Sequence, residues 1–209
     1  MKRNSLVAVT VFSILVFFAW AVWTSFEFHR LGAENAPAKP ATSSDSSGDA
    51  GNLMPGGLSL LEKPAPAFTL EDLSGRKVSL AGYRGKALLL NFWATWCGAC
   101  KIETPWLIEL RNQYAPQGFE VLGISVDDLD PGNAEILADQ KREIAHFVEQ
   151  MHMPYPVLID GNSISQPYGG LDELPTSFFV NREGVVVAMQ VGVTSKAEIA
   201  GNIRKALGM

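Results

Sequence analysis

The sequence has little of what several large classes of protein depend on. Its 209 residues include two cysteines and three histidines, too few for a disulfide framework or a zinc finger. Basic side chains are outnumbered, giving a net charge of −5, so we expect no nucleic-acid partner. No internal repeat is visible. Since 47% of the residues are hydrophobic and 19% are charged, disorder along the whole chain is excluded, and the length fits one domain with appendages.

A long uncharged stretch lies near the N-terminus. Residues 5–26 contain no charged side chain, and as a helix they would span about 33 Å, the thickness of a bilayer's hydrocarbon core. Lys2 and Arg3 precede the stretch, so the positive-inside rule predicts that residues 1–4 are cytoplasmic and the rest of the chain is outside. The sequence therefore predicts a single-pass anchor in the cytoplasmic (inner) membrane, with contact to the lipid bilayer through residues 5–26.

The alternative is a cleaved signal peptide, because Ala19-Trp20-Ala21 matches a small-x-small cleavage site. The apolar run continues past Ala21, which favours an uncleaved anchor. A buried core helix is disfavoured because the stretch adjoins a flexible tether. Both leading interpretations export the remainder of the chain, so we expect an extracytoplasmic, periplasmic domain.

A linker and a globular domain follow. Residues 27–60 are rich in Ala, Gly, Ser, Pro and Asp, above all between 32 and 57, and predict a flexible linker. Residues 61–209 are long enough to bury a sizeable core. The first 60 residues carry equal numbers of acidic and basic side chains, so the negative excess falls within residues 61–209.

The globular domain alternates strands with helices. Apolar runs predict five strands, at residues 87–93, 121–126, 156–159, 177–180 and 185–189. Helices are expected at about 97–114, 133–151 and 196–207, with Pro105 as a kink in the first and with Ile136, Ile144, Phe147, Val148 and Met151 on the apolar face of the second. This order predicts an α/β domain whose central mixed sheet, flanked by helices, has parallel strands first and a hairpin last.

The two cysteines stand at Cys97-Gly98-Ala99-Cys100, just past a predicted buried strand and at the start of a predicted helix. Helix N–H groups and the macrodipole stabilise a thiolate there, so Cys97 is the expected attacking sulfur. Cys100 lies one turn further on, close enough to form a disulfide with Cys97 and displace a bound partner. The pattern predicts a redox-active disulfide, whose chemistry requires no cofactor.

Other uses of the pair fit less well. A zinc site needs about four ligands, and no second pair exists. A structural disulfide across so short a loop would stabilise little. Haem attachment requires a histidine directly after the second cysteine, where Lys101 stands.

The chain resembles the thioredoxin fold, and specifically its membrane-anchored TlpA/ResA/DsbE branch, over roughly residues 64–207. The residues that carry the resemblance are F-W-A-T-W-C-G-A-C-K at 92–101 with Pro105, Leu174-Pro175-Thr176, P-A-F-T-L at 66–70, and V-S-L-A-G-Y-R-G-K at 78–86. The resemblance implies an extracytoplasmic thiol-disulfide oxidoreductase that usually works as a reductant.

The resemblance also implies site residues. Cys97 would be the catalytic nucleophile and Cys100 the resolving thiol. Pro175 would be a cis-proline facing the pair, Leu174 would offer backbone to a bound peptide, and Trp96 would join them in binding substrate.

Glu103, three residues after Cys100, matches a glutamate that this branch uses near its active site. A carboxylate one helical turn from a buried thiol can move a proton during resolution, which makes Glu103 a catalytic candidate. The alternative is a solvated helix glutamate. Asn91 occupies the position of the buried acid of thioredoxin, so a proton shuttle in this chain must come from elsewhere.

By the same resemblance, the substrates are disulfide-containing exported proteins, such as apocytochrome c or a copper-site protein of oxidase assembly. A membrane electron donor of the DsbD/CcdA type is required, because glutathione and thioredoxin do not reach that compartment. The dipeptide Gly98-Ala99 lacks the histidine of strong oxidants of this fold, which favours a reducing or intermediate potential, and it also lacks the usual thioredoxin proline.

Two other functions stay open. A thiol peroxidase with antioxidant activity shares this fold, but its chemistry uses a lone cysteine preceded by Thr and Arg helpers, whereas Trp96 precedes the pair here. A copper-binding assembly factor could use the soft ligands of Met151-His152-Met153, although core packing is the simpler role for the two methionines, and His152 and His146 are expected at the surface.

The acidic segment D-D-L-D-P-G-N at residues 127–133 has no established calcium-ligand spacing. We expect a solvated loop there that shapes partner recognition, and no metal site.

Overall fold

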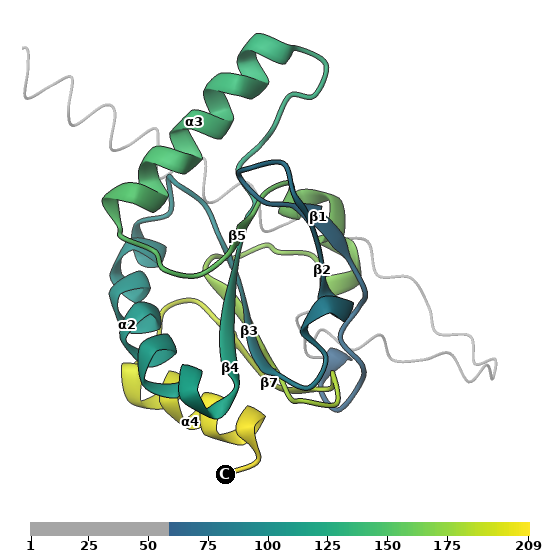
Figure 1. Ribbon diagram of the computed structural model, residues 1–209, viewed down its shortest axis with the longest axis vertical. Coiled ribbons are helices and arrows are strands. Elements are labelled where there is room, and N and C mark those ends of the chain that lie inside the picture. The colour runs from purple at the N-terminus through teal and green to yellow at the C-terminus, as the bar shows by residue number, and fades with distance from the viewer. Residues whose placement is uncertain (1–58) are drawn as a thin grey trace, which may run out of the picture. The chain divides into compact units, whose positions relative to one another are not determined.

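The computed structural model describes residues 59–209 (Figure 1). The predicted anchor at 5–26 and nearly all of the predicted linker lie outside the described residues. Within the described part, no helix combines the length and the apolar character that crossing a membrane requires.

A five-stranded mixed sheet forms the centre of the described region, in the order β5-β4-β3-β6-β7. The strands run from Ala87–Trp93 (β3), Phe119–Ser125 (β4), Val157–Leu158 (β5), Thr176–Val180 (β6) and Val186–Val191 (β7). β4 is parallel to both β3 and β5, whereas β6 is antiparallel to both β3 and β7. The predicted arrangement of parallel strands followed by a hairpin is confirmed. Every residue of β3 is buried, as its continuous apolar run predicts.

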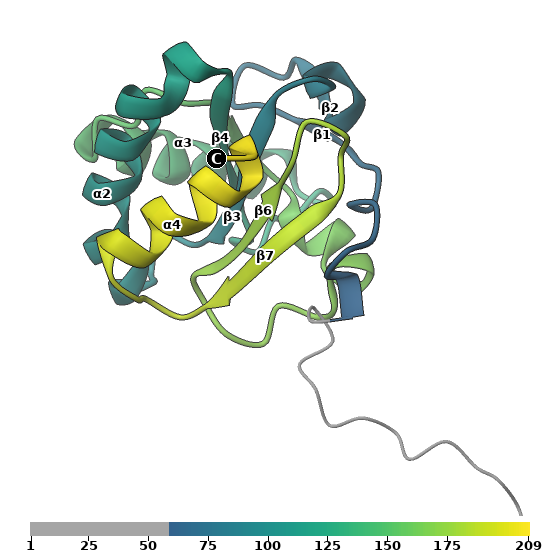
Figure 2. The same cartoon turned by 90° about the horizontal axis from the view of Figure 1, so that it is seen from below.

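Three α-helices surround the sheet: α2 (Gly98–Tyr114), α3 (Ala134–Gln150) and α4 (Lys196–Leu207). Short 3-10 helices are η2 (Leu80–Tyr83), η3 (Ala115–Gln117), η4 (Gly161–Ile164) and η5 (Gln166–Tyr168). The α-helices match their predicted ranges to within a residue. Each begins at a capping side chain, namely Cys97, Asn133 and Ser195. α2 and α4 lie side by side over one face of the sheet (Figure 2).

An aromatic cluster fills the opposite face. Successive side chains of a strand point to opposite faces, so Phe92 points away from the face to which its neighbour Asn91 belongs. The ring of Phe92 packs 5.2 Å from that of Tyr168, which packs 5.1 Å from Phe178. The Tyr168 hydroxyl donates to the Pro66 carbonyl at 2.7 Å, so the buried phenol is satisfied and fixes the start of the domain.

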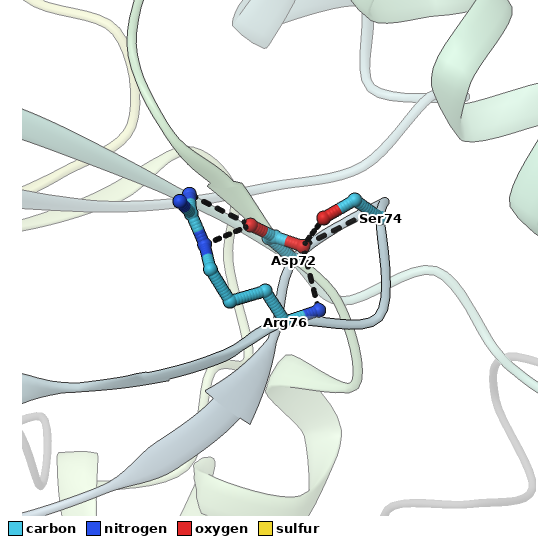
Figure 3. A network of polar contacts seen from close by, with 3 residues as sticks. All are labelled: Asp72, Ser74 and Arg76. Atoms are coloured by element: carbon cyan, nitrogen blue, oxygen red, sulfur yellow. Dashed lines mark hydrogen bonds and ion pairs between the residues drawn. The ribbon is translucent and has the colours of Figure 1, made fainter.

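A small antiparallel hairpin, β1 (Thr69–Glu71) and β2 (Lys77–Ser79), adds a second sheet. Asp72 closes its turn by accepting hydrogen bonds from both the backbone and the side chains of Ser74 and Arg76 (Figure 3). The Ser74 hydroxyl, and after it the other donors, lowers the pKa of the Asp72 carboxyl against the opposing effect of burial. The Ile159 N–H donates to the Glu71 carbonyl at 2.9 Å, which ties the hairpin to the end of β5.

The predicted apolar face of α3 is right at its C-terminal half and wrong at its start. Ile144 and Phe147 are buried, and the Phe147 ring stacks on Trp93 with centroids 4.8 Å apart. Ile136 is 44% exposed. The first turns of α3, to which Ile136 belongs, extend past the sheet (Figure 1).

Candidate active site

The turn between β3 and α2 positions the first cysteine. Cys97 is the N-cap of α2, and its sulfur accepts a hydrogen bond from the Cys100 backbone N–H at 3.1 Å. This donor and the helix macrodipole favour negative charge on the Cys97 sulfur in the reduced protein. The local sequence therefore places a stabilised thiolate at the helix start.

Asp127 holds this turn from the neighbouring strand end. Its carboxylate accepts from the Thr95 N–H at 3.0 Å, from the Thr95 hydroxyl at 2.6 Å and from the Ser125 hydroxyl at 2.8 Å. The expectation of a solvated loop from residue 127 onward is therefore wrong at Asp127, which is half-buried. Its position just after a strand parallel to β3 was the signal, because the carboxyl ends of parallel strands meet at one edge of a sheet.

Cys97 and Cys100 form a disulfide, with their Cα atoms 5.3 Å apart. Cys97 is 5% exposed and Cys100 is 2% exposed. Cys97 lines a surface groove and Cys100 does not. A substrate disulfide can therefore reach Cys97 first, as expected for an attacking sulfur with Cys100 behind it.

Glu103, one turn after Cys100 in α2, is buried with 1% of its surface exposed, which excludes a solvated helix glutamate. Asn91 donates to one carboxylate oxygen at 3.0 Å, and Gln190 donates to the other at 3.1 Å. Burial raises the pKa of Glu103 to about 7, and the two amide hydrogen bonds oppose this rise. The carboxyl group thus reaches the Asn91 side chain from α2, and it titrates near neutral pH.

Two polar side chains of this network, Gln190 and Ser177, were not identified from the sequence. Gln190 follows Val186 and Ala188 on the inward face of β7, so strand alternation could have flagged a polar side chain at a buried position. Asn91 also donates to the Ser177 hydroxyl at 3.0 Å. Within the described part of the chain, the side-chain amide oxygen (Oε1) of Gln190 has no hydrogen-bond partner.

Tyr155 is the other titratable side chain close to Glu103. Burial, and after it the nearby Glu103 carboxylate, raises the pKa of its phenol above the ordinary value, against a hydrogen bond with Thr104. Tyr155 therefore stays protonated at neutral pH. Glu103, one helical turn after Cys100, is thus the group of this network that gains and loses a proton near pH 7.

Two of the three predicted substrate-binding residues, Trp96 and Leu174, lie around Cys97. The Leu174–Pro175 peptide bond is cis. Leu174 and Trp96 line the same groove as Cys97, and Trp96 is 70% exposed. The structure thus brings Trp96, Leu174 and Cys97 together in one groove, whereas Pro175 is buried and is not among the residues that line it.

The Met151-His152-Met153 segment lies after α3. Both methionines are partly buried and pack against the core, and His152 is exposed. In residues 59–209, no group of three or more His, Cys, Asp or Glu side chains is arranged to hold a metal ion. The methionines therefore have a packing role in this structure.

Comparison with known proteins agrees with this geometry. Residues 61–189 match the AhpC/TSA family. The thiol-disulfide oxidoreductase ResA of Bacillus thuringiensis (strain Al Hakam) is 35% identical over 144 residues, covering 68% of this chain and 76% of ResA. ResA of Bacillus subtilis (strain 168) is 30% identical over 135 residues, covering 65% and 69%.

Among solved structures, a thiol:disulfide interchange protein of the thioredoxin family from Chlorobium tepidum TLS superimposes with a TM-score of 0.59 and 30% identity, covering 69% of this chain and 96% of that one. The fold, the cysteine pair at the helix start and these relatives agree. The chain belongs to the AhpC/TSA family and is, within it, a thiol-disulfide oxidoreductase of the ResA/DsbE type.

Proposed function

We propose that the protein reduces disulfides of exported proteins on the outer face of the cytoplasmic membrane, to which residues 5–26 anchor it. The observation that supports this best is the Cys97–Cys100 pair at the start of α2, with the buried Glu103 carboxyl one turn beyond it. The uncharged stretch at 5–26 supports the membrane location.

The reduced protein acts in two steps. The Cys97 thiolate attacks one sulfur of the substrate disulfide, a mixed disulfide forms, and the other substrate sulfur leaves as a thiolate that takes up a proton. Cys100 then loses its proton to Glu103 and attacks the Cys97 sulfur. This closes the Cys97–Cys100 disulfide and releases the second substrate sulfur, so two electrons have passed to the substrate.

A second dithiol must restore the protein. We propose a membrane electron donor of the DsbD/CcdA type, which returns two electrons and leaves Cys97 and Cys100 as thiols. Apocytochrome c and copper-site proteins of oxidase assembly are the proposed substrates, because they are exported proteins whose cysteines must be reduced before they bind haem or copper.

The reduction potential of the Cys97–Cys100 pair tests the reductant assignment. The full chain is equilibrated in redox buffers, and free thiols are alkylated and counted by mass. A value near that of thioredoxin, about −270 mV, is expected for a dedicated reductant. A value above about −180 mV would make the protein an oxidant or isomerase and would remove the cytochrome and copper-site assignments.

A further inference from the structure

The groove beside the disulfide has one apolar part and one acidic part. Trp96 and Leu174 line it next to Cys97, and the carboxylates of Asp128, Asp172 and Glu173 complete its rim. A substrate disulfide must enter this groove to reach the Cys97 sulfur. The groove is therefore a docking site because of the cysteine, independently of its charge.

The charge of the groove has one sign. Its lining residues include three carboxylates and no Lys, Arg or His. The five ion pairs within residues 59–209 involve none of these three carboxylates, and all three residues are exposed. Their negative charge is thus left for whatever enters the groove.

The carboxylates reach the rim from two segments. Asp128 follows β4 and accepts a hydrogen bond from Asn162 at 3.0 Å, while the same Asn162 amide donates to the Val126 carbonyl at 3.0 Å. Asp172 and Glu173 directly precede Leu174 and the cis-proline. The three do not converge as metal ligands. Their placement on two segments of the rim suits an extended chain lying along the groove better than a single cation.

We propose that this groove selects disulfides whose cysteines are flanked by lysine or arginine in an extended, locally unfolded segment of the substrate. This inference rests on the proposed function and specifies its substrate class. The Trp96 and Leu174 side chains contact the segment on either side of its cysteine, and Asp128, Asp172 and Glu173 attract its cationic side chains.

The preference arises mainly during encounter. Carboxylates around a concave site raise the local concentration of a cationic partner and its association rate. Added salt weakens this attraction because charges farther apart than the Debye length, about 8 Å at 0.15 M, are largely screened. Each exposed carboxylate contributes a small attraction to a cationic substrate. Together, the three predict that cationic disulfides react roughly 5- to 10-fold faster than anionic ones at low ionic strength.

Two peptides test the proposal. Each carries one intramolecular Cys-x-x-Cys disulfide, flanked on both sides by lysines in one peptide and by glutamates in the other. The reduced full-length protein is mixed with each peptide, and the second-order rate constant of peptide reduction is measured. Each rate constant is divided by the rate constant for reduction of the same peptide by dithiothreitol. This ratio corrects for the effect of the flanking charges on the reactivity of the peptide disulfide itself.

We expect the lysine peptide to react 5- to 10-fold faster at 20 mM salt, and the ratio to approach one at 500 mM, on the order expected for screened surface charge. The triple substitution Asp128→Asn, Asp172→Asn and Glu173→Gln should remove most of the ratio. The matched substitution Glu143→Gln, Glu149→Gln and Glu183→Gln removes three exposed carboxylates elsewhere and should leave it unchanged.

The outcomes distinguish the charge preference of the groove from the reductase function. Equal normalised rates for both peptides would overturn the charge preference and leave the reductase function intact. An equal loss in both triple variants would show that net charge, not the groove, sets the preference. If neither peptide were reduced although dithiothreitol reduces both, the proposed function would fall, and the inference with it.

Discussion

At the scale of single residues, Glu103 is the buried carboxyl of the active site, with a pKa raised to about 7. Thioredoxin places its buried acid on a strand, at the position that Asn91 occupies here. In this chain the carboxyl comes from α2 instead and is held by the amides of Asn91 and Gln190. We propose that this carboxyl fills the same proton-transfer role from a different element.

Substitution Glu103→Gln tests this role. With 5,5'-dithiobis(2-nitrobenzoate), the first release of thionitrobenzoate reports attack by Cys97, and the second reports resolution by Cys100. The wild-type second release should accelerate through pH 7, because the pKa of Glu103 is about 7. The variant should lose this inflection and resolve about a hundredfold more slowly at pH 8.

The first release should change little, since Cys97 is activated by the helix start and not by Glu103. Glu143→Gln, at an exposed position of α3, is the control and should match the wild type in both phases. An unchanged pH profile of the second phase in Glu103→Gln would remove the carboxyl from the mechanism.

Gln190 lowers the pKa of Glu103, as a smaller effect than burial and the hydrogen bond from Asn91. Its amide donates to the carboxylate at 3.1 Å and so favours the ionised form. In Gln190→Met this donor is lost, and the inflection of the second phase should move upward by about one pH unit, as expected for one hydrogen bond to a charged group. Gln113→Met on the exposed face of α2 should leave it in place. A downward movement would contradict the assigned direction of the hydrogen bond.

At the scale of elements, the join between β3 and α2 depends on a residue of another strand end. Asp127 satisfies both the N–H and the hydroxyl of Thr95, two residues before Cys97. Removing the carboxylate leaves these groups without their partner in a half-buried turn. The geometry of the helix start, and with it the thiolate, therefore rests on a side chain 30 residues after the cysteine.

Asp127→Ala should lower the free energy of unfolding by about 2 kcal/mol. It should also slow alkylation of reduced Cys97 at pH 6 severalfold, because a displaced turn weakens the stabilisation of the thiolate. Urea denaturation and timed iodoacetamide labelling measure the two effects. Asp139→Ala, which breaks an exposed pair with Arg142, should cost less than about 0.5 kcal/mol. Normal alkylation in Asp127→Ala would reduce Asp127 to a purely stabilising residue.

The elements themselves were largely predictable from the sequence. The buried run of β3 and the cysteines that open α2 have local signals, because apolar periodicity and helix-start chemistry act over a few residues. For Asp127 and Gln190 the local pattern shows only a carboxylate after a strand and a polar side chain on a strand's inward face. Their roles depend on which strands become neighbours in the sheet, which the spacing of apolar residues does not specify. The predicted burial of Ile136 is wrong for a related reason. The apolar pattern of a helix does not show how far along the helix the rest of the protein covers its apolar face.

At the scale of the whole molecule, two buried carboxyl groups give stability opposite dependences on pH. The lowered pKa of Asp72 means that the folded state favours its ionised form, so this contribution is present above the unfolded pKa and is lost as the pH falls below it. Glu103 behaves in the opposite way. Its pKa rises from 4.5 to about 7 on folding, so the folded state binds this proton more tightly and loses stability as the pH rises between these values.

Glu103→Gln should therefore gain stability over the wild type as the pH increases. The pKa shift corresponds to about 3 kcal/mol of unfolding free energy when the carboxyl is fully ionised. The introduced amide can be accommodated, because the side-chain oxygen of Gln190, which has no hydrogen-bond partner in the described residues, can turn to accept from it. Urea denaturation of the oxidised protein at pH 4.5, 6, 7 and 8 measures the difference between the two proteins. This difference should grow up to about pH 7.5 and then level off. The stability difference between Asp72→Asn and the wild type should instead stay constant above about pH 4 and shrink as the pH falls below that value. A difference for Glu103→Gln that stays constant from pH 4.5 to 8 would mean that Glu103 ionises in the folded protein as freely as in the unfolded chain, and both its raised pKa and its role as a proton acceptor at neutral pH would have to be abandoned.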